Sequence, residues 1–209
     1  MKPRQRESSR HARPAARLLL AIFVVLLPAL ASHAQHSVDV GLTYTQERSK
    51  FANTYCQCFP MRGATVDVAA DLWHGVGVAA MASGTSVTNL RGSIDIEQIN
   101  FMGGLRYDLK LGQNQALAWG RKGSIFVEAL GGYVFATSGL YPNSNRTALT
   151  TNASALTYMG GGGVNLHVYH RLDWRVIEAD YVMSDLPNGG NNQQRTLRLA
   201  SGLNFHIGH

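Results

Sequence analysis

The stretch LRLASGLNFHI, residues 197–207, alternates between two kinds of side chain. Its odd positions carry Leu, Leu, Ser, Leu, Phe and Ile, whereas its even positions carry Arg, Ala, Gly, Asn and His. Successive side chains of a β-strand point to opposite faces, so the pattern predicts a strand with one apolar and one polar face. The two faces must therefore meet different surroundings.

The same alternation recurs in seven earlier segments of about 10 residues, the length that a tilted strand needs to cross a bilayer. The first of them places Val38, Val40, Leu42 and Tyr44 on one face. An even number of strands near eight is what a small closed barrel requires. We therefore expect an all-β fold, an eight-stranded antiparallel up-and-down transmembrane β-barrel, formed by residues 37–46, 63–73, 76–87, 99–108, 124–136, 155–168, 172–183 and 196–207.

The polar faces of these segments favour a membrane barrel over a soluble one. A soluble barrel would carry many Lys and Glu residues along its wet outer face, and these strands carry few. Their Gly, Asn, Asp and single Arg residues can instead fill a narrow lumen by pairing with one another, which leaves no wide pore. We interpret them as packing and registry elements, with a narrow conduction path as the alternative. The expected polar lumen network is Asp67, Asp71, Asn100, Arg106, Glu128, Glu178, Asp180 and Arg198.

Two segments break the alternation. The seventh has Arg175 at an odd position but Glu178 and Asp180 at even positions. Just before the fourth, Asp95 and Glu97 lie at odd positions, whereas the polar residues Asn100 and Arg106 of that segment lie at even positions. Either a β-bulge restores the phase in each case, or the offending charges lie beyond the hydrocarbon.

The connections between the segments differ in length. If the chain starts in the periplasm, most of the long polar connections face outward, as in outer-membrane barrels. Residues 109–123 would then form an unusually long periplasmic turn. We expect the strands to be scaffold and the connections 47–62, 137–154 and 184–195 to form the contact surface.

Residues 1–34 have the organisation of an export signal. Six Lys or Arg lie between Lys2 and Arg17, and an apolar stretch of about 13 residues, too short to span a bilayer as a helix, precedes Ala34. Residues 35–209, the expected barrel domain, keep 13 basic and 12 acidic residues, which lowers the net charge from +6 to about +1. A nucleic-acid partner, which requires a basic folded domain, is therefore not expected.

Two features of the sequence carry a resemblance to a known family. The stretch ASGLNFHI, residues 200–207, resembles the C-terminal assembly signal of outer-membrane barrels, although it lacks a terminal Phe and two residues follow it. Two stretches are similar to the OmpA-like outer-membrane β-barrel domain family, in particular to small acidobacterial members. They are CQCFPMRGATVDVAADL, residues 56–72, and the closing WRVIEADYVMSDLPNGGNNQQRTLRLASGLNFHIG, residues 174–208. We expect a monomer in the bacterial outer membrane, with outer-membrane lipids and the barrel assembly machinery as partners. The assembly signal would comprise Gly202, Leu203, Phe205 and Ile207.

Few residues suggest further chemistry. Cys56 and Cys58 could form a local disulfide, since the compartment is oxidising, although a ring closed over one residue is tight. Free thiols and metal binding remain the alternatives for this pair. The GGGG at residues 160–163 lacks the Lys and Ser or Thr of a phosphate loop and is better explained by barrel curvature or close approach of a neighbour. We expect no metal and no cofactor.

An enzyme would resemble the barrels that modify lipid A, which place Ser, His and an acid at the membrane surface. The candidates for such a site are His167, His170, His206, Ser184, Ser201 and Glu178. No nucleophile motif accompanies them, so we do not expect an enzyme. The expected role is structural or surface-facing, through the outward loops. The alternatives are a narrow porin-like channel for small polar solutes and, third, a soluble periplasmic lipocalin-like binder.

Overall fold

A computed structural model of the protein describes residues 37–50, 58–90, 94–111, 122–139, 141–142, 149–187 and 192–207. The predicted signal, Cys56 and the side chain of Cys58 lie outside this part. The signal peptide and the disulfide therefore stay predictions. Within the described ranges, no helix is long and apolar enough to cross a membrane.

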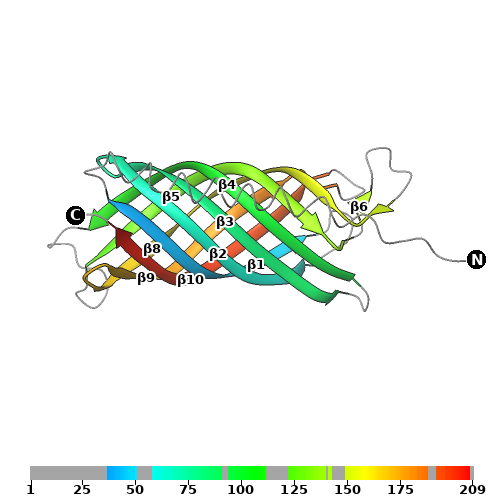
Figure 1. The fold of residues 1–209 in the computed structure, drawn as a ribbon, viewed down its shortest axis with the longest axis horizontal. Coiled ribbons are helices and arrows are strands. Elements are labelled where there is room, and N and C mark those ends of the chain that lie inside the picture. Colours follow the sequence, from blue (N-terminus) through cyan, green and yellow to red (C-terminus); the bar gives the residue numbers. More distant parts are fainter. Residues whose placement is uncertain are drawn as a thin grey trace, which may run out of the picture. The chain divides into compact units, whose positions relative to one another are not determined.

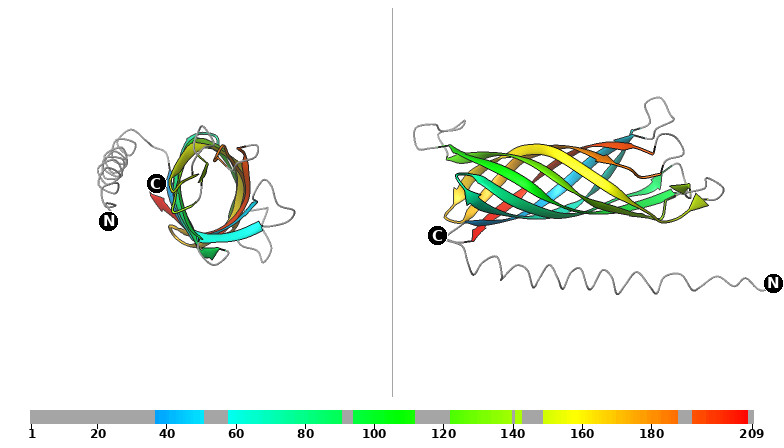
Figure 2. Two further views of the ribbon diagram at one scale, coloured as in Figure 1. Left: turned by 90° about the vertical axis from the view of Figure 1, so that its right-hand side faces the viewer. Right: turned by 90° about the horizontal axis from the view of Figure 1, so that it is seen from above.

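Eight long strands form a closed antiparallel barrel, which confirms the predicted fold class (Figures 1 and 2). Its closure joins the first strand to the last, in continuous register from the pair Val38 and Ile207 to the pair Ser49 and Thr196. The order around the barrel is β1, β10, β9, β8, β5, β4, β3, β2. The strands are β1 (Val38–Lys50), β2 (Cys58–Trp73), β3 (Val76–Leu90), β4 (Ile94–Leu111), β5 (Gly123–Thr137), β8 (Ala153–Tyr169), β9 (Leu172–Ser184) and β10 (Gln194–Ile207).

The outer face is apolar and the inner face is polar, as the alternation predicts. In β10, Leu197 and Leu203 face outward with exposed fractions of 50% and 42%, whereas Thr196, Arg198 and Asn204 are buried. The other strands follow the same rule, so large apolar side chains cover the outside. This is the polarity of a barrel whose outside meets lipid, and it is the reverse of a soluble barrel.

The strands extend beyond the predicted boundaries, and the connections are correspondingly shorter. The predicted loop 47–62 is strand up to residue 50 and again from residue 58, which leaves 51–57 as the connection. Likewise, 184–195 shortens to 185–193. The predicted boundaries stopped where the outward residues cease to be apolar, but the backbone pairing continues past that point.

The predicted loop 137–154 contains a short hairpin of its own. Strands β6 (Tyr141–Pro142) and β7 (Leu149–Thr150) pair in a separate two-stranded sheet. This hairpin lies at the end of the barrel opposite Ile207, the last residue of β10 (Figure 1). At the other end, β2 and β3 are joined by His74 and Gly75, whose φ angles of 48° and 85° suit a tight two-residue hairpin turn.

The two breaks in alternation have different causes. In β9 the pairing with β8 moves from Ile177 to Arg175, so Val176 is a bulge that lets Arg175 and Glu178 both face inward. In β4 no shift interrupts the register from Ile96 to Tyr107. Asp95 and Glu97 are exposed on the outer face near the start of that strand. This position agrees with the alternative that these charges lie beyond the hydrocarbon.

Gly161 on β8 allows its neighbours to approach closely. A Cβ at this position would lie 2.5 Å from the backbone oxygen of Ala179 and 2.7 Å from the Cα of Asp180. Gly160, the preceding residue, faces outward, and a methyl group added there would have no heavy atom within 4 Å. A side chain at Gly161 would therefore clash with the neighbouring strand, whereas a side chain at Gly160 would not.

We expect Gly161→Ala to lower the free energy of unfolding by about 1–3 kcal/mol, because the methyl group overpacks the lumen. The matched variant Gly160→Ala should change it by less than about 0.5 kcal/mol, since the methyl group meets open space. Urea titration of both variants in lipid vesicles measures the difference. Equal effects at the two positions would contradict the assignment of inner and outer face.

Candidate functional site

A row of inward-facing residues crosses six neighbouring strands in the lumen. Each member lies directly opposite the next across a strand pair, and the charges along the row run positive, negative, neutral, negative, positive, negative. In register order the row consists of Arg106, Glu128, Gly161, Asp180, Arg198 and Glu47. The strand register alone therefore places opposite charges side by side.

Arg175 joins two strands that are not neighbours. On β9 it lies between the charged row and Leu172, the first residue of that strand. Its guanidinium donates from Nη1 and Nη2 to the two carboxylate oxygens of Asp67 at 2.7 and 3.1 Å. Nη1 also donates to Oε2 of Glu178 at 2.7 Å, and Nε donates to the side-chain oxygen of Asn165 at 3.4 Å. The pair with Asp67 crosses the lumen from β9 to β2, so it links two strands that β10 and β1 separate around the barrel.

Arg198 neutralises the acids of β9 from the neighbouring strand. Its Nε donates to Oδ2 of Asp180 at 2.8 Å, its Nη2 donates to Oε1 of Glu178, and its Nη1 donates to the hydroxyl of Thr65 at 3.3 Å. The side chains of Arg198 and both acids are at most 2% exposed. Charges this deeply buried are tolerated only when they are paired, and here each acid accepts from a guanidinium.

Arg106 completes the network beside an aromatic ring. It donates from Nε and Nη2 to Asp108 at 2.8 and 3.0 Å, while Nη1 lies 3.8 Å from Asp67 and 4.0 Å from Glu128. The guanidinium carbon lies 3.9 Å from the centroid of the Phe126 ring, and that of Arg175 lies 4.8 Å from it. Phe126 therefore makes cation–π contacts with two guanidinium groups.

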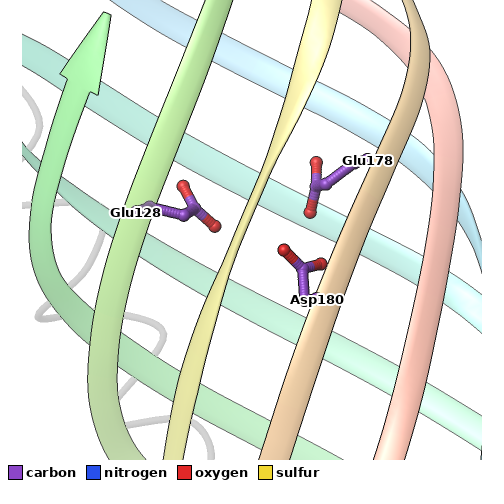
Figure 3. Close-up of side chains that lie close together, drawn as sticks. All are labelled: Glu128, Glu178 and Asp180. Carbon is purple, nitrogen blue, oxygen red and sulfur yellow. The ribbon is translucent and has the colours of Figure 1, made fainter.

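Three carboxylates converge across strand β8. Glu128 comes from β5, and Glu178 and Asp180 come from β9; Figure 3 shows them turned toward one another with β8 between. One oxygen from each lies within 4.8 Å of the others. Gly161 separates Glu128 from Asp180 in the register and has no side chain to keep them apart. Two of the three acids accept from Arg198, so a guanidinium already supplies the positive charge that a metal ion would bring.

The structure brings together most of the eight residues predicted for the lumen. Asp67, Arg106, Glu128, Glu178, Asp180 and Arg198 form the network described above. Asp71 lies near the end of β2, where it accepts from Lys110 at 2.9 Å. Asn100 faces inward but donates to Ser83 at 3.3 Å, apart from the charged network.

Sequence reasoning missed several members of the lumen, among them Arg175, Glu47 and Phe126. Arg175 was excluded by its parity, which only the bulge at Val176 explains. Glu47, 3% exposed and accepting from Thr85 at 3.2 Å, fell in a predicted loop. Phe126 lies on the inner face although it is aromatic, and no signal in the pattern distinguishes it from an outward Phe.

Apolar clusters adjoin the charged network inside the barrel. Next to the charged row, side chains from six strands form one buried cluster: Ala69, Ala79, Met81, Met102, Leu130, Met159 and Val182. Nearer the hairpin, Phe59, Met61 and Ile96 form a second cluster. Val134, Ala136, Tyr141 and Leu186 form a third, in which burial raises the pKa of the Tyr141 hydroxyl.

The opposite mouth carries a separate ionic cluster. Nδ1 of His206 lies 2.5 Å from Asp39 on β1, and its Nε2 lies 3.0 Å from Asp173 on β9. His167 contacts the second oxygen of Asp173 at 2.8 Å. A neutral imidazole has one N–H, so only the imidazolium donates to both acids. In that form His206 links three strands at the closing seam.

The residues considered for an enzyme do not form a nucleophile–base pair. Ser184 pairs with Gln194 at the far end of β10 from His206. The hydroxyl of Ser201 donates to the backbone oxygen of Arg175 at 3.0 Å. His170 lies in the exposed turn between β8 and β9. The geometry of the described residues therefore supplies no candidate for acyl transfer.

Comparisons with known proteins identify the fold. No protein-family model matches the chain, and no curated protein matches it. Neisserial surface protein A has 11% identity and a TM-score of 0.58 over 83% of this chain and 98% of its own. Ail, the attachment invasion locus protein of Yersinia pestis, crystallised with the heparin analogue sucrose octasulfate, has 14% identity and a TM-score of 0.51 over 83% of this chain and 100% of its own.

The structural similarity places the fold among small eight-stranded outer-membrane barrels. This supports the coarser part of the resemblance found in the sequence. The specific likeness to acidobacterial members and the C-terminal assembly signal stay predictions.

We expect Arg175→Met to lower the free energy of unfolding by about 3–5 kcal/mol, because Asp67 and Glu178 would lose a buried partner. Lys110→Met, which removes the 69%-exposed partner of Asp71, should cost less than about 1 kcal/mol. Equilibrium unfolding of the two variants in vesicles gives both values. A cost below about 1 kcal/mol for Arg175→Met would show that the lumen is hydrated enough to replace the guanidinium.

For the mouth cluster, we expect His206→Asn to lower the free energy of unfolding by about 1.5–3 kcal/mol. The amide is neutral and carries both of its N–H groups on one nitrogen, whereas the imidazolium is charged and donates to the two carboxylates from separate ring nitrogens. His170→Asn, in the exposed turn, is the control and should be nearly neutral. The measurement is the urea midpoint and slope of each variant. Equal midpoints for the two variants would refute the link across the seam.

Proposed function

We propose that the protein is an outer-membrane β-barrel with a filled lumen, whose role is structural or surface-facing. The observation that supports this most strongly is the polarity of the barrel: apolar side chains cover the outside, and a paired ionic network occupies the inside. A closed barrel of this polarity satisfies its backbone hydrogen bonds without water, which a membrane requires. A water-soluble lipocalin-like binder would place these apolar side chains inward.

The content of the lumen argues against the channel alternative. The guanidinium groups of Arg175 and Arg198 cross-link strands, and that of Arg106 lies 3.8 Å from Asp67. The apolar cluster that contains Met81, Met102 and Met159 adjoins them. An ion entering the lumen would have to displace these side chains or leave its hydration shell among methionines. The charges therefore act as packing and registry elements, and no enzymatic step is assigned to them.

The end of the barrel that carries β6 is the surface we assign to the exterior. The chain enters and leaves the barrel at the other end, so the connections near β6 would face outward if residue 37 starts in the periplasm. Those connections and the strand ends beside them would contact other molecules, while the strands hold them in place. We also propose that the protein is a monomer and that the barrel assembly machinery inserts it into the membrane.

Planar-bilayer recording tests this function, after a gel-mobility assay has shown that the protein is folded. We expect the detergent-extracted protein to change mobility on boiling, because a closed barrel stays folded in detergent until it is heated. The folded protein should then show no discrete conductance steps. Steps that disappear in Arg198→Gln would establish the channel instead, and release of the protein without detergent would establish a soluble barrel.

A further inference from the structure

Three outward-facing arginines gather on neighbouring strands at the end of the barrel that carries β6. They are Arg195 on β10, Arg48 on β1 and Arg62 on β2, and all three side chains are exposed. These strands are consecutive around the barrel, with β1 in the middle. The three residues are called the arginine rim below.

The register places the members of the arginine rim within reach of one ligand. Arg48 lies directly opposite Leu197 on β10 and opposite Pro60 on β2. Arg195 and Arg62 are each two residues from those partners, so both are diagonal neighbours of Arg48. Diagonal neighbours have Cα atoms roughly 7–8 Å apart, a distance that long arginine side chains easily span.

No ion pair neutralises the arginine rim within the described part of the chain. The acid next to Arg48 on β1, Glu47, points into the lumen and accepts from Thr85. The outward acids Asp95 and Glu97 lie on β4, and β3 separates that strand from β2. The rim therefore has no acid beside it on β1, β2 or β3.

On the β9 side, one exposed acid lies near the edge of the arginine rim. Asp185 follows the last residue of β9, and Arg195 pairs with Met183 on that strand. Asp185 is therefore diagonal to Arg195 alone, and β10 lies between it and Arg48. One acid at the edge leaves an excess of positive charge on the rim, so an anion that contacts all three arginines would be stabilised.

The surroundings of the arginine rim select an amphipathic partner. Toward the middle of the barrel, the outer face of the same strands carries Leu199, Leu42 and Tyr44, with exposed fractions of 44%, 53% and 57%. The arginines therefore lie where the apolar outer face ends. A ligand held here would place acyl chains on the apolar face and an anionic group on the guanidinium groups.

We propose that the arginine rim binds the phosphate-bearing headgroup of a lipid in the leaflet at this end of the barrel. The guanidinium fork matches phosphate oxygens in a bidentate geometry, and Arg is more weakly hydrated than Lys, which favours binding at an interface. This inference rests on the proposed function, because it needs the outer face to meet lipid. The proposed function says only that this end of the barrel contacts other molecules, and the present inference names a phosphate-bearing lipid as one of them.

Binding is tested by titrating the folded protein, in zwitterionic detergent micelles, with lipid A that carries two phosphates and counting bound lipid by native mass spectrometry. The triple variant Arg48→Gln, Arg62→Gln, Arg195→Gln should bind at least about tenfold more weakly. The matched triple variant Lys110→Gln, Lys122→Gln, Arg171→Gln removes the same charge from exposed residues near the other end of the barrel. It should bind within about twofold of the unchanged protein.

Two further probes distinguish the lipid from its phosphate alone. Dephosphorylated lipid A should bind the unchanged protein as weakly as the arginine triple variant binds the phosphorylated form. Inositol hexakisphosphate, a soluble polyanion without acyl chains, should compete only at concentrations at least about tenfold above those of lipid A, because it makes no contact with the apolar face. Competition at equal or lower concentration would overturn the lipid assignment in favour of a soluble anion.

The remaining outcomes separate this inference from the proposed function. Unchanged affinity in the arginine triple variant, or equal losses in the two triple variants, overturns the arginine rim as a site. Each sample is also run with and without boiling. If the unchanged protein shows no heat-dependent shift, the proposed membrane barrel fails, whereas a normal shift with unchanged binding overturns only the lipid site.

Discussion

The pairing of β1 with β10 is the constraint on which the rest of the structure depends. In a bilayer an unpaired strand edge would leave a row of backbone N–H and C=O groups without partners, and each group would cost several kcal/mol. The continuous register from Val38 to Ser49 removes that edge. Closure also sets the width of the lumen, because eight strands leave an interior that side chains can just fill. The polar inner face and the apolar outer face follow from this geometry.

The filled lumen poses an electrostatic problem that the strand register partly solves. Acids and arginines alternate across neighbouring strands, so most charges meet an opposite charge without long excursions of the side chain. Gly161 leaves room for the carboxylates on either side of β8, and the Phe126 ring contacts the guanidinium groups of Arg106 and Arg175. Such a network contributes little net stability compared with an apolar core, but it is costly to break. It therefore specifies one register among the many that eight alternating strands could adopt.

The fold could be predicted from the sequence because period-two alternation directly reports two unlike faces. The same pattern located all eight barrel strands, although it ended them where the outward residues stop being apolar. It could not place Arg175, because one bulge residue, Val176, reverses the parity of everything before it in β9. Glu47 was missed for a related reason, since the strand continues past the last apolar residue of β1. Partners across the lumen, such as Arg175 and Asp67, are 108 residues apart in sequence, and nothing local indicates that they meet.

The central claim is that β1 and β10 close the barrel in the register described. A pair of cysteines at Leu42 and Leu203, which lie directly opposite each other on the outer face, tests it in a chain with Cys56 and Cys58 changed to Ser. Neighbouring strands bring such residues within the range of Cα distances that a disulfide allows, whereas the control pair at Leu42 and Leu197 is displaced along the strand by six residues. We expect oxidation in the membrane to cross-link the first pair alone, giving a boiled, non-reduced band of altered mobility that reducing agent abolishes. Absence of the cross-link, or equal cross-linking of the two pairs, would contradict closure in this register.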